Sequence, residues 1–161
     1  MILNIFNFAA NKYQDMIQRI QTVFLFLAAI CGFSLLGLPF AKTPQAVQTS
    51  ALFADAKFWA GDNIGLIVLF AVAGALAIAA LAMFKNRLLQ IKLSRVSLIS
   101  GILGLVLAVL LFWMDTKNLA AAEIQDGAGA YLPFGFLLFV ILAIRFIRKD
   151  EALVKSTDRL R

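Results

Sequence analysis

Four long stretches without a charged residue dominate this chain. They cover residues 20–41, 64–84, 96–114 and 127–144. A helix needs ~20 apolar residues to cross a ~30 Å hydrocarbon layer at 1.5 Å per residue. A soluble helical protein would carry polar side chains along one face of each helix. The 161 residues are 62% hydrophobic and 15% charged, against roughly 45–50% and 25% in a soluble domain, so the pattern predicts a multi-pass membrane protein.

We expect a single domain over residues 16–161 with an all-α membrane fold, four transmembrane helices in an up-down bundle. The expected helices span about residues 18–41, 64–84, 96–114 and 128–147. The tail over residues 148–161 has no proline or glycine, so it should form a cytoplasmic helical extension of the fourth helix. Two roles are open for this tail, a helix lying in solvent or lipid headgroups and a docking element for a cytoplasmic partner.

Lysine and arginine are distributed unequally between the two sides of the predicted bundle. Of the 15, all but Lys42, Lys57 and Lys117 fall in the N-terminal segment, the hinge at 85–95 or the C-terminal segment 145–161. The positive-inside rule places that side, with both termini, in the cytoplasm of a bacterium whose inner (cytoplasmic) membrane holds the chain. Anionic lipids attract each such residue by about 1 kcal/mol, so the net charge of +6 requires no nucleic acid as partner. The expected cytoplasmic basic anchors are Arg19, Lys85, Arg87, Lys92, Arg95, Arg145, Arg148 and Lys149.

Residue types that carry chemistry are scarce. There is no histidine, and Cys31 is the single cysteine. These facts exclude haem and zinc sites that need histidine, and nucleophile pairs of the Ser-His or Cys-His kind. We therefore expect no enzyme activity, no cofactor and no metal site. No Asp, Glu, Lys or Arg lies inside the four stretches, whereas transporters and proton relays normally keep an ionisable residue there.

The residues at the outer ends of the stretches allow two interpretations. Asp62 and Asp115 are either interface anchors or the frame of an outward-facing mouth for an ion or substrate. Aromatic side chains gather at membrane–water interfaces, and Trp59, Trp113 and Tyr131 would form such an outer belt.

Small residues recur at helical spacing in the first three stretches. Rows of this kind let two helix backbones approach closely, which is how helices associate in lipid. The neighbour could be another helix of the same chain or another subunit. The candidate helix-packing residues are Ala28, Gly32, Ala71, Ala75, Ala79, Ser97, Gly101, Gly104 and Ala108.

More specific motifs stand at the two ends. The segment Met16-Ile-Gln-Arg-Ile-Gln-Thr, with the apolar run after it, resembles the opening of a family of small Bacteroidota membrane proteins, and residues 142–161 resemble the family's C-terminal signature. That family is catalogued as domain of unknown function 4293. The resemblance implies four spanning helices and no known activity, so it assigns no catalytic residue. It leaves out residues 1–15, which we expect to be an N-terminal extension with a non-native or mis-assigned start.

The sequence favours an interaction protein, a non-catalytic accessory or scaffold subunit of an inner-membrane assembly. The lipid bilayer and a membrane-protein partner or a second copy of the chain are the expected partners. The alternative is a small-solute or ion transporter that acts as an oligomer. A membrane enzyme is the least supported of the three classes.

The predicted topology can be tested by cysteine labelling. A cysteine that replaces Thr49 should react with a membrane-impermeant reagent from outside the inner membrane, because the Lys and Arg bias places that loop outside. A cysteine that replaces Ser156 should react only after the membrane is opened. Labelling of both positions from the same side would contradict the four-crossing topology.

Overall fold

A computed structural model describes residues 20–48, 50–118 and 124–158, with side chains up to residue 152. Residues 1–15 and Arg19, for which an extension and an anchor are expected, lie outside this described part. The described residues form four helices. The N-terminal helix is Ile20–Ser34, and α2 (Ile64–Ala82), α3 (Arg87–Asp115) and α4 (Leu132–Asp158) follow it. The last three are long and apolar enough to cross a membrane.

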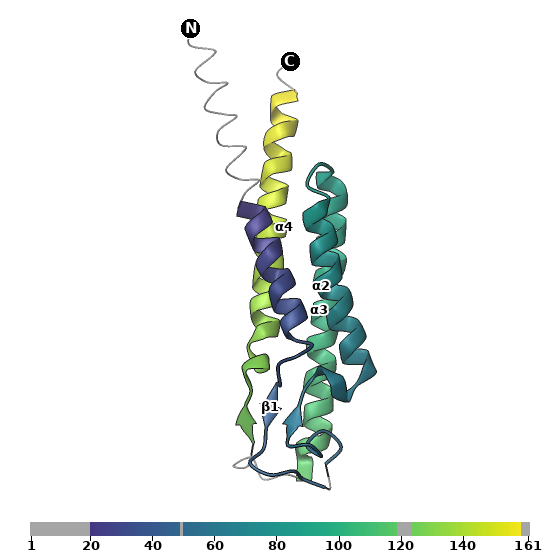
Figure 1. Cartoon of the computed structure of the whole chain (residues 1–161). Helices are drawn as coiled ribbons and strands as arrows, with labels where there is room; N and C mark the ends of the chain where they lie inside the picture. The colour runs from purple at the N-terminus through teal and green to yellow at the C-terminus, as the bar shows by residue number, and fades with distance from the viewer. Residues whose placement is uncertain (1–19, 49, 119–123, 159–161) are drawn as a thin grey trace.

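The helices run between two different ends of the molecule (Figure 1). One end, which we call the inner end because the Lys and Arg bias predicts it to be cytoplasmic, holds the first described turn of the N-terminal helix, the α2–α3 turn at residues 83–86 and the last described turns of α4. A small sheet forms the opposite end, which we call the sheet end. The helix α3 packs against both α2 and α4. The N-terminal helix packs against α4, where Phe24 stacks on Phe139 and Phe146.

The helix α3 begins at Arg87, nine residues before the expected start at 96. The Asn86 side chain accepts a hydrogen bond from the Leu89 N–H at 3.1 Å, which caps the new N-terminus. No glycine or proline interrupts residues 87–95. The predicted basic hinge at 85–95 is therefore mostly helix, because a good cap and helix-compatible residues outweigh the charges, which are exposed at Lys92 and Arg95.

The first helix ends at Ser34 and not near residue 41 as expected. Leu35–Gly37 form a turn, and Pro39 disfavours helical geometry in the residue before it. The chain then enters strand β1 (Ala41–Lys42), which pairs antiparallel with β2 (Lys57–Phe58) and with β3 (Gln125–Asp126). The sheet order is β2-β1-β3, so the all-α expectation missed a small three-stranded cap.

Two glycines hold the last strand of this cap against the segment before β1. The N–H groups of Gly127 and Gly129 donate to the carbonyl oxygens of Phe40 and Pro39, both at 2.9 Å. A Cβ atom at either glycine would collide with the Pro39 carbonyl. Backbone approach this close needs glycine, and it fixes the start of α4 against the first loop.

The small residues of α3 lie against aromatic rings of the neighbouring helices. A Cβ on Gly104 would stand 2.7 Å from the Phe70 ring of α2, and one on Gly101 would overlap the Phe136 ring of α4. The Ser97 and Ser100 hydroxyls each donate to a backbone carbonyl of α2, at Ala73 and Leu69, over 2.7 Å. The small residues of α3 therefore contact rings and carbonyl groups of the same chain.

The two remaining small-residue rows differ from one another. In the N-terminal helix Ala28 is buried, and a Cβ on Gly32 would lie 3.0 Å from the Gly74 Cα, so this helix and α2 meet closely there. Ala108 of α3 is buried as well. On α2, however, Ala75 is exposed while Ala71 and Ala79 are half-buried. The fully buried small residues of α2 are instead Ala73, Gly74, Ala77 and Ala80.

The Gly104 contact can be tested by adding atoms to it. Gly104→Ala and Gly104→Leu should progressively destabilise the monomer in detergent, the leucine by ~1–3 kcal/mol, because the added side chain meets the buried Phe70 ring. Gly135→Ala is the matched control, since its Cβ would meet nothing nearer than the Cys31 Sγ at 3.7 Å. Alanine also has the higher helix propensity, so the control should be neutral or stabilising. Equal thermal stability for the Gly104 and Gly135 variants would contradict the packing.

Candidate functional site

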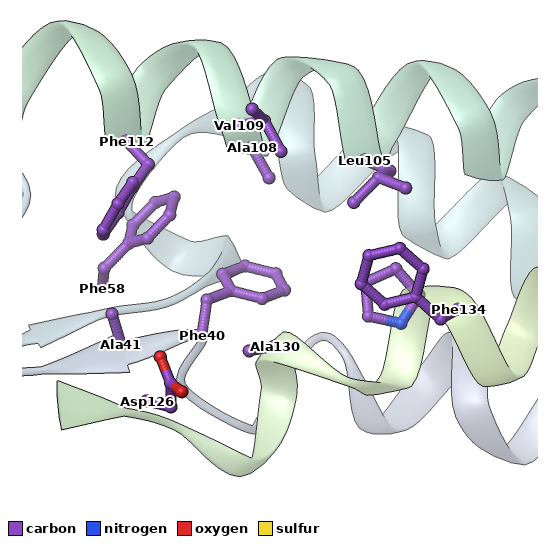
Figure 2. Close-up of a pocket in the computed structure, with 11 residues that line it drawn as sticks. Phe40, Ala41, Phe58, Leu105, Ala108, Val109, Phe112, Asp126, Ala130 and Phe134 are labelled. Carbon is purple, nitrogen blue, oxygen red and sulfur yellow. The ribbon is translucent and has the colours of Figure 1, made fainter.

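An apolar cavity lies between α3, the small sheet and the start of α4 (Figure 2). We call it the outer aromatic cavity. Its volume is about 220 Å³. The lining residues come from the three strands and the residue before β1, from α3, and from the start of α4 with the turn before it: Phe40, Ala41, Phe58, Leu105, Ala108, Val109, Phe112, Asp126, Ala130, Pro133 and Phe134.

Pairing of β1 and β2 sets the inner wall of this cavity. The strands bring the Phe40 and Phe58 rings to 5.2 Å, and Phe58 stacks on Phe112 of α3 at 6.2 Å. Phe40 and Phe58 are buried, whereas Val109 and Phe134 at the opening are 56% and 62% exposed. Aromatic pairs at these separations stabilise one another beyond the area that they bury. The contacts of these rings with one another therefore hold the cavity wall in place without a ligand.

One carboxylate lies at the rim of the cavity. Figure 2 shows the Asp126 side chain beside Ala41 and below Phe40. Its Oδ2 accepts a hydrogen bond from the exposed Tyr131 hydroxyl at 3.2 Å. A ligand with an apolar part and a hydrogen-bond donor would therefore match both features of the cavity.

Asp115 and Asp62, the candidate frame of an outward-facing mouth, both hold loops of the cap. Asp115 accepts hydrogen bonds from the Ser50 hydroxyl and from the N–H of Ala51 at 3.1 Å and of Leu52 at 3.3 Å. Asp62 accepts from the Trp59 N–H at 2.8 Å. This geometry favours the anchor interpretation of both residues.

Burial raises the pKa of the Asp62 carboxyl, although its hydrogen bond from the Trp59 backbone lowers the pKa and the charge of Asp55 raises it further. Trp59, Trp113 and Tyr131 are exposed near the sheet end, and the Lys117 ammonium lies 4.2 Å from the Trp113 ring centroid. Such a position fits an aromatic belt at one membrane interface.

A second group of polar residues lies toward the inner end, each next to the same buried apolar group along its helix, and we call it the inner polar cluster: Gln21, Arg87, Gln90 and Asp150. Arg87 Nε and Asp150 Oδ2 are 2.7 Å apart, and the Asp150 side chain is fully buried. Gln21 and Gln90 are buried too, and their amides find no hydrogen-bond partner within the described part of the chain. Burying polar groups without hydrogen-bond partners costs free energy, so the two glutamines lower the stability of the fold.

The helices position this cluster just beyond an apolar layer. Leu25, Ile91 and Ile147 belong to one buried group, and the cluster residues are their neighbours along each helix. The sequence analysis does not single out Asp150, because both roles open for the tail leave this charged segment outside the packed helices. A signal existed, since Ala143, Ile147 and Asp150 follow one another at spacings of four and three residues and therefore share a helix face.

The expected basic anchors gather at the inner end. Arg87 is half-buried in its ion pair with Asp150. The other anchors in the described part are exposed, and they are Lys85, Lys92, Arg95, Arg145, Arg148 and Lys149. Nowhere in the described ranges do three His, Cys, Asp or Glu side chains gather where they could share a metal ion.

Comparison with protein-family models gives a match over residues 17–160 to the family described as domain of unknown function (DUF4293). The chain belongs to the DUF4293 family. No curated protein matches it. The matched region of this DUF4293 chain includes the outer aromatic cavity and the inner polar cluster in full.

The inner ion pair of the DUF4293 chain makes a quantitative prediction. Arg87→Met should lower the free energy of unfolding by ~3–5 kcal/mol, because it leaves the Asp150 carboxylate buried without its cation. The double variant Arg87→Met with Asp150→Leu should recover most of that loss. Thermal unfolding in detergent measures both, with the exposed Lys92→Met as the control at the same end. An Arg87→Met protein as stable as the Lys92→Met protein would refute the structural role of the pair.

Proposed function

We propose that this DUF4293 protein is a non-catalytic accessory or scaffold subunit of an assembly in the bacterial inner membrane. In this proposal it crosses the membrane four times as an up-down bundle, with both termini and the tail of α4 in the cytoplasm. The distribution of charge supports the orientation, since the basic anchors cluster at the inner end and Lys42, Lys57 and Lys117 lie at the sheet end, the first two of them in β1 and β2.

The observation that carries the proposal is the outer aromatic cavity. Its volume of about 220 Å³ is smaller than the ~300–1,000 Å³ of small-molecule sites. A single large apolar side chain from a neighbouring protein suits it better. Interfaces are dominated by a few such anchors in preformed pockets, and the rigid aromatic wall supplies a preformed pocket at little ordering cost.

The small-residue rows support docking at the cavity because they are already in contact with other parts of the same chain. Gly101 and Gly104 meet rings of the same chain, and Gly32 meets the backbone at Gly74. These faces are therefore used for packing within the monomer. The open cavity, with the Asp126 carboxylate as a hydrogen-bond acceptor at its rim, offers a partner a better contact than the rows do.

A photo-crosslinking amino acid in place of Phe134, in cells that express the protein natively, tests this proposal. Phe134 lies at the cavity opening, so we expect a discrete protein adduct. The same amino acid at Leu138, which is similarly exposed on α4 but outside the cavity, should not give that adduct. Val109→Trp, which fills the opening, should abolish the adduct, and the matched Val106→Trp on the exposed surface of α3 should not.

Each alternative result has a distinct meaning. Adducts only of lipid mass, or identical adducts from positions 134 and 138, would overturn docking at the cavity. An adduct of two copies of this chain would replace the accessory subunit by a homo-oligomer. Insensitivity to Val109→Trp would show that the captured protein does not occupy the cavity.

The inner polar cluster favours a second candidate, a small-solute or ion transporter acting as an oligomer. Ionisable residues buried among transmembrane helices are often proton or ion relays. Asp150 belongs to the part of α4 that we propose to be cytoplasmic, but its side chain is fully buried beside Arg87, at the end of the helices where a relay would take up or release its ion. Purified protein in liposomes with a proton gradient would show flux that Asp150→Asn removes while the protein stays folded. Absence of flux in the parent protein with a range of monovalent cations would count against this candidate.

A further inference from the structure

A groove between α3 and α4 near the inner end combines positive charge with an apolar floor. Its cavity volume is about 550 Å³. The lining consists of three arginines and four aliphatic residues: Arg95, Leu98, Ile99, Ile141, Ile144, Arg145 and Arg148. We call it the arginine groove. It lies outside both the outer aromatic cavity and the inner polar cluster.

The arginine groove is polar at one end and apolar at the other. Because α3 starts at the inner end and α4 finishes there, Leu98 and Ile99 lie farther from the inner end than Arg95. On α4, Ile141 and Ile144 lie farther from it than Arg148 for the same reason. Ile99 and Ile141 are 57% and 50% exposed, so an apolar strip of the groove faces outward. This order of charge and apolar surface is the order of a phospholipid, whose headgroup lies outside its acyl chains.

The charge of the groove is not neutralised by its own lining. Three guanidinium groups line it and no carboxylate does. The Asp150 carboxylate, two residues beyond Arg148, is engaged by Arg87. Arginine presents several N–H donors in a planar fork that fits the oxygens of a phosphate. Basic pockets between transmembrane helices at the cytoplasmic side bind anionic lipid headgroups for this reason.

We propose that the arginine groove is a binding site for one anionic phospholipid of the cytoplasmic leaflet, with its phosphate held by Arg95, Arg145 and Arg148 and an acyl chain against Ile99 and Ile141. The single negative charge of the phosphodiester offsets part of the +3 charge of the three arginines that line the groove. The acyl chain covers the apolar strip between the two helices. A bound lipid thereby links α3 to α4 where their contact leaves a groove.

Native mass spectrometry of the purified full chain tests the site. After exchange into detergent with defined lipid, we expect a single phosphatidylglycerol to be retained in preference to phosphatidylethanolamine of the same chains. The triple variant Arg95→Gln, Arg145→Gln, Arg148→Gln should weaken phosphatidylglycerol binding by about tenfold or more. The matched control is Lys85→Gln, Lys92→Gln, Lys149→Gln, which removes the same charge from exposed residues at the same end outside the groove.

A second variant keeps the test valid if the arginine triple variant fails to fold. Ile141→Trp fills the apolar floor and leaves every charge in place, so it should also reduce phosphatidylglycerol retention. Leu138→Trp, at an equally exposed position of α4 that does not line the groove, should not.

Four results would overturn the proposal. Equal loss in the arginine and lysine triple variants would mean general surface attraction. Equal retention of phosphatidylglycerol and phosphatidylethanolamine would mean no recognition of charge. Displacement of the lipid by millimolar inorganic phosphate would mean an ion site and not a lipid site. Unchanged retention in Ile141→Trp would place the lipid elsewhere.

Discussion

The close approach of α3 to its neighbours is the contact on which the rest of the structure depends. Lipid provides no hydrophobic force between helices, so packing and hydrogen bonds must hold them together. Gly101 and Gly104 admit the Phe136 and Phe70 rings, and the Ser97 hydroxyl bonds to a carbonyl of α2. This contact joins the two neighbours of α3 through one helix. The ring centroids of Phe70 and Phe40 are 5.9 Å apart. This contact connects α2 to the cap and hence to the outer aromatic cavity.

Much of the helical architecture could be predicted from the sequence, because an apolar run of about 20 residues in lipid has few alternatives. The cap could not. Its strands contain two residues each, too few to show any alternation, and the pairing joins Ala41 to Phe58 and to Asp126, far apart in the chain. The register depends on backbone contacts such as that of Gly127 with Phe40, which no local pattern encodes.

The candidate sites were predictable to different degrees. Lys and Arg placement indicated the basic end, but the pairing of Arg87 with Asp150 required the tertiary arrangement of α3 and α4. The buried face of α2 was ambiguous for another reason. Alanine occupies positions 71, 73, 75, 77, 79, 80 and 82, so small residues occur on every side of the helix. The choice between Ala73 and Ala75 is made by the neighbours and not by the helix itself.

The length of α3 has a mechanical consequence. This helix has 29 residues and α2 has 19, and it continues without proline from the inner end to the side of the sheet. Arg95 and Phe112, which line the inner groove and the outer cavity, are therefore about 25 Å apart on one continuous rod. A tilt of that rod displaces a wall of both openings at once. The outer aromatic cavity and the arginine groove therefore share one continuous helix as a wall.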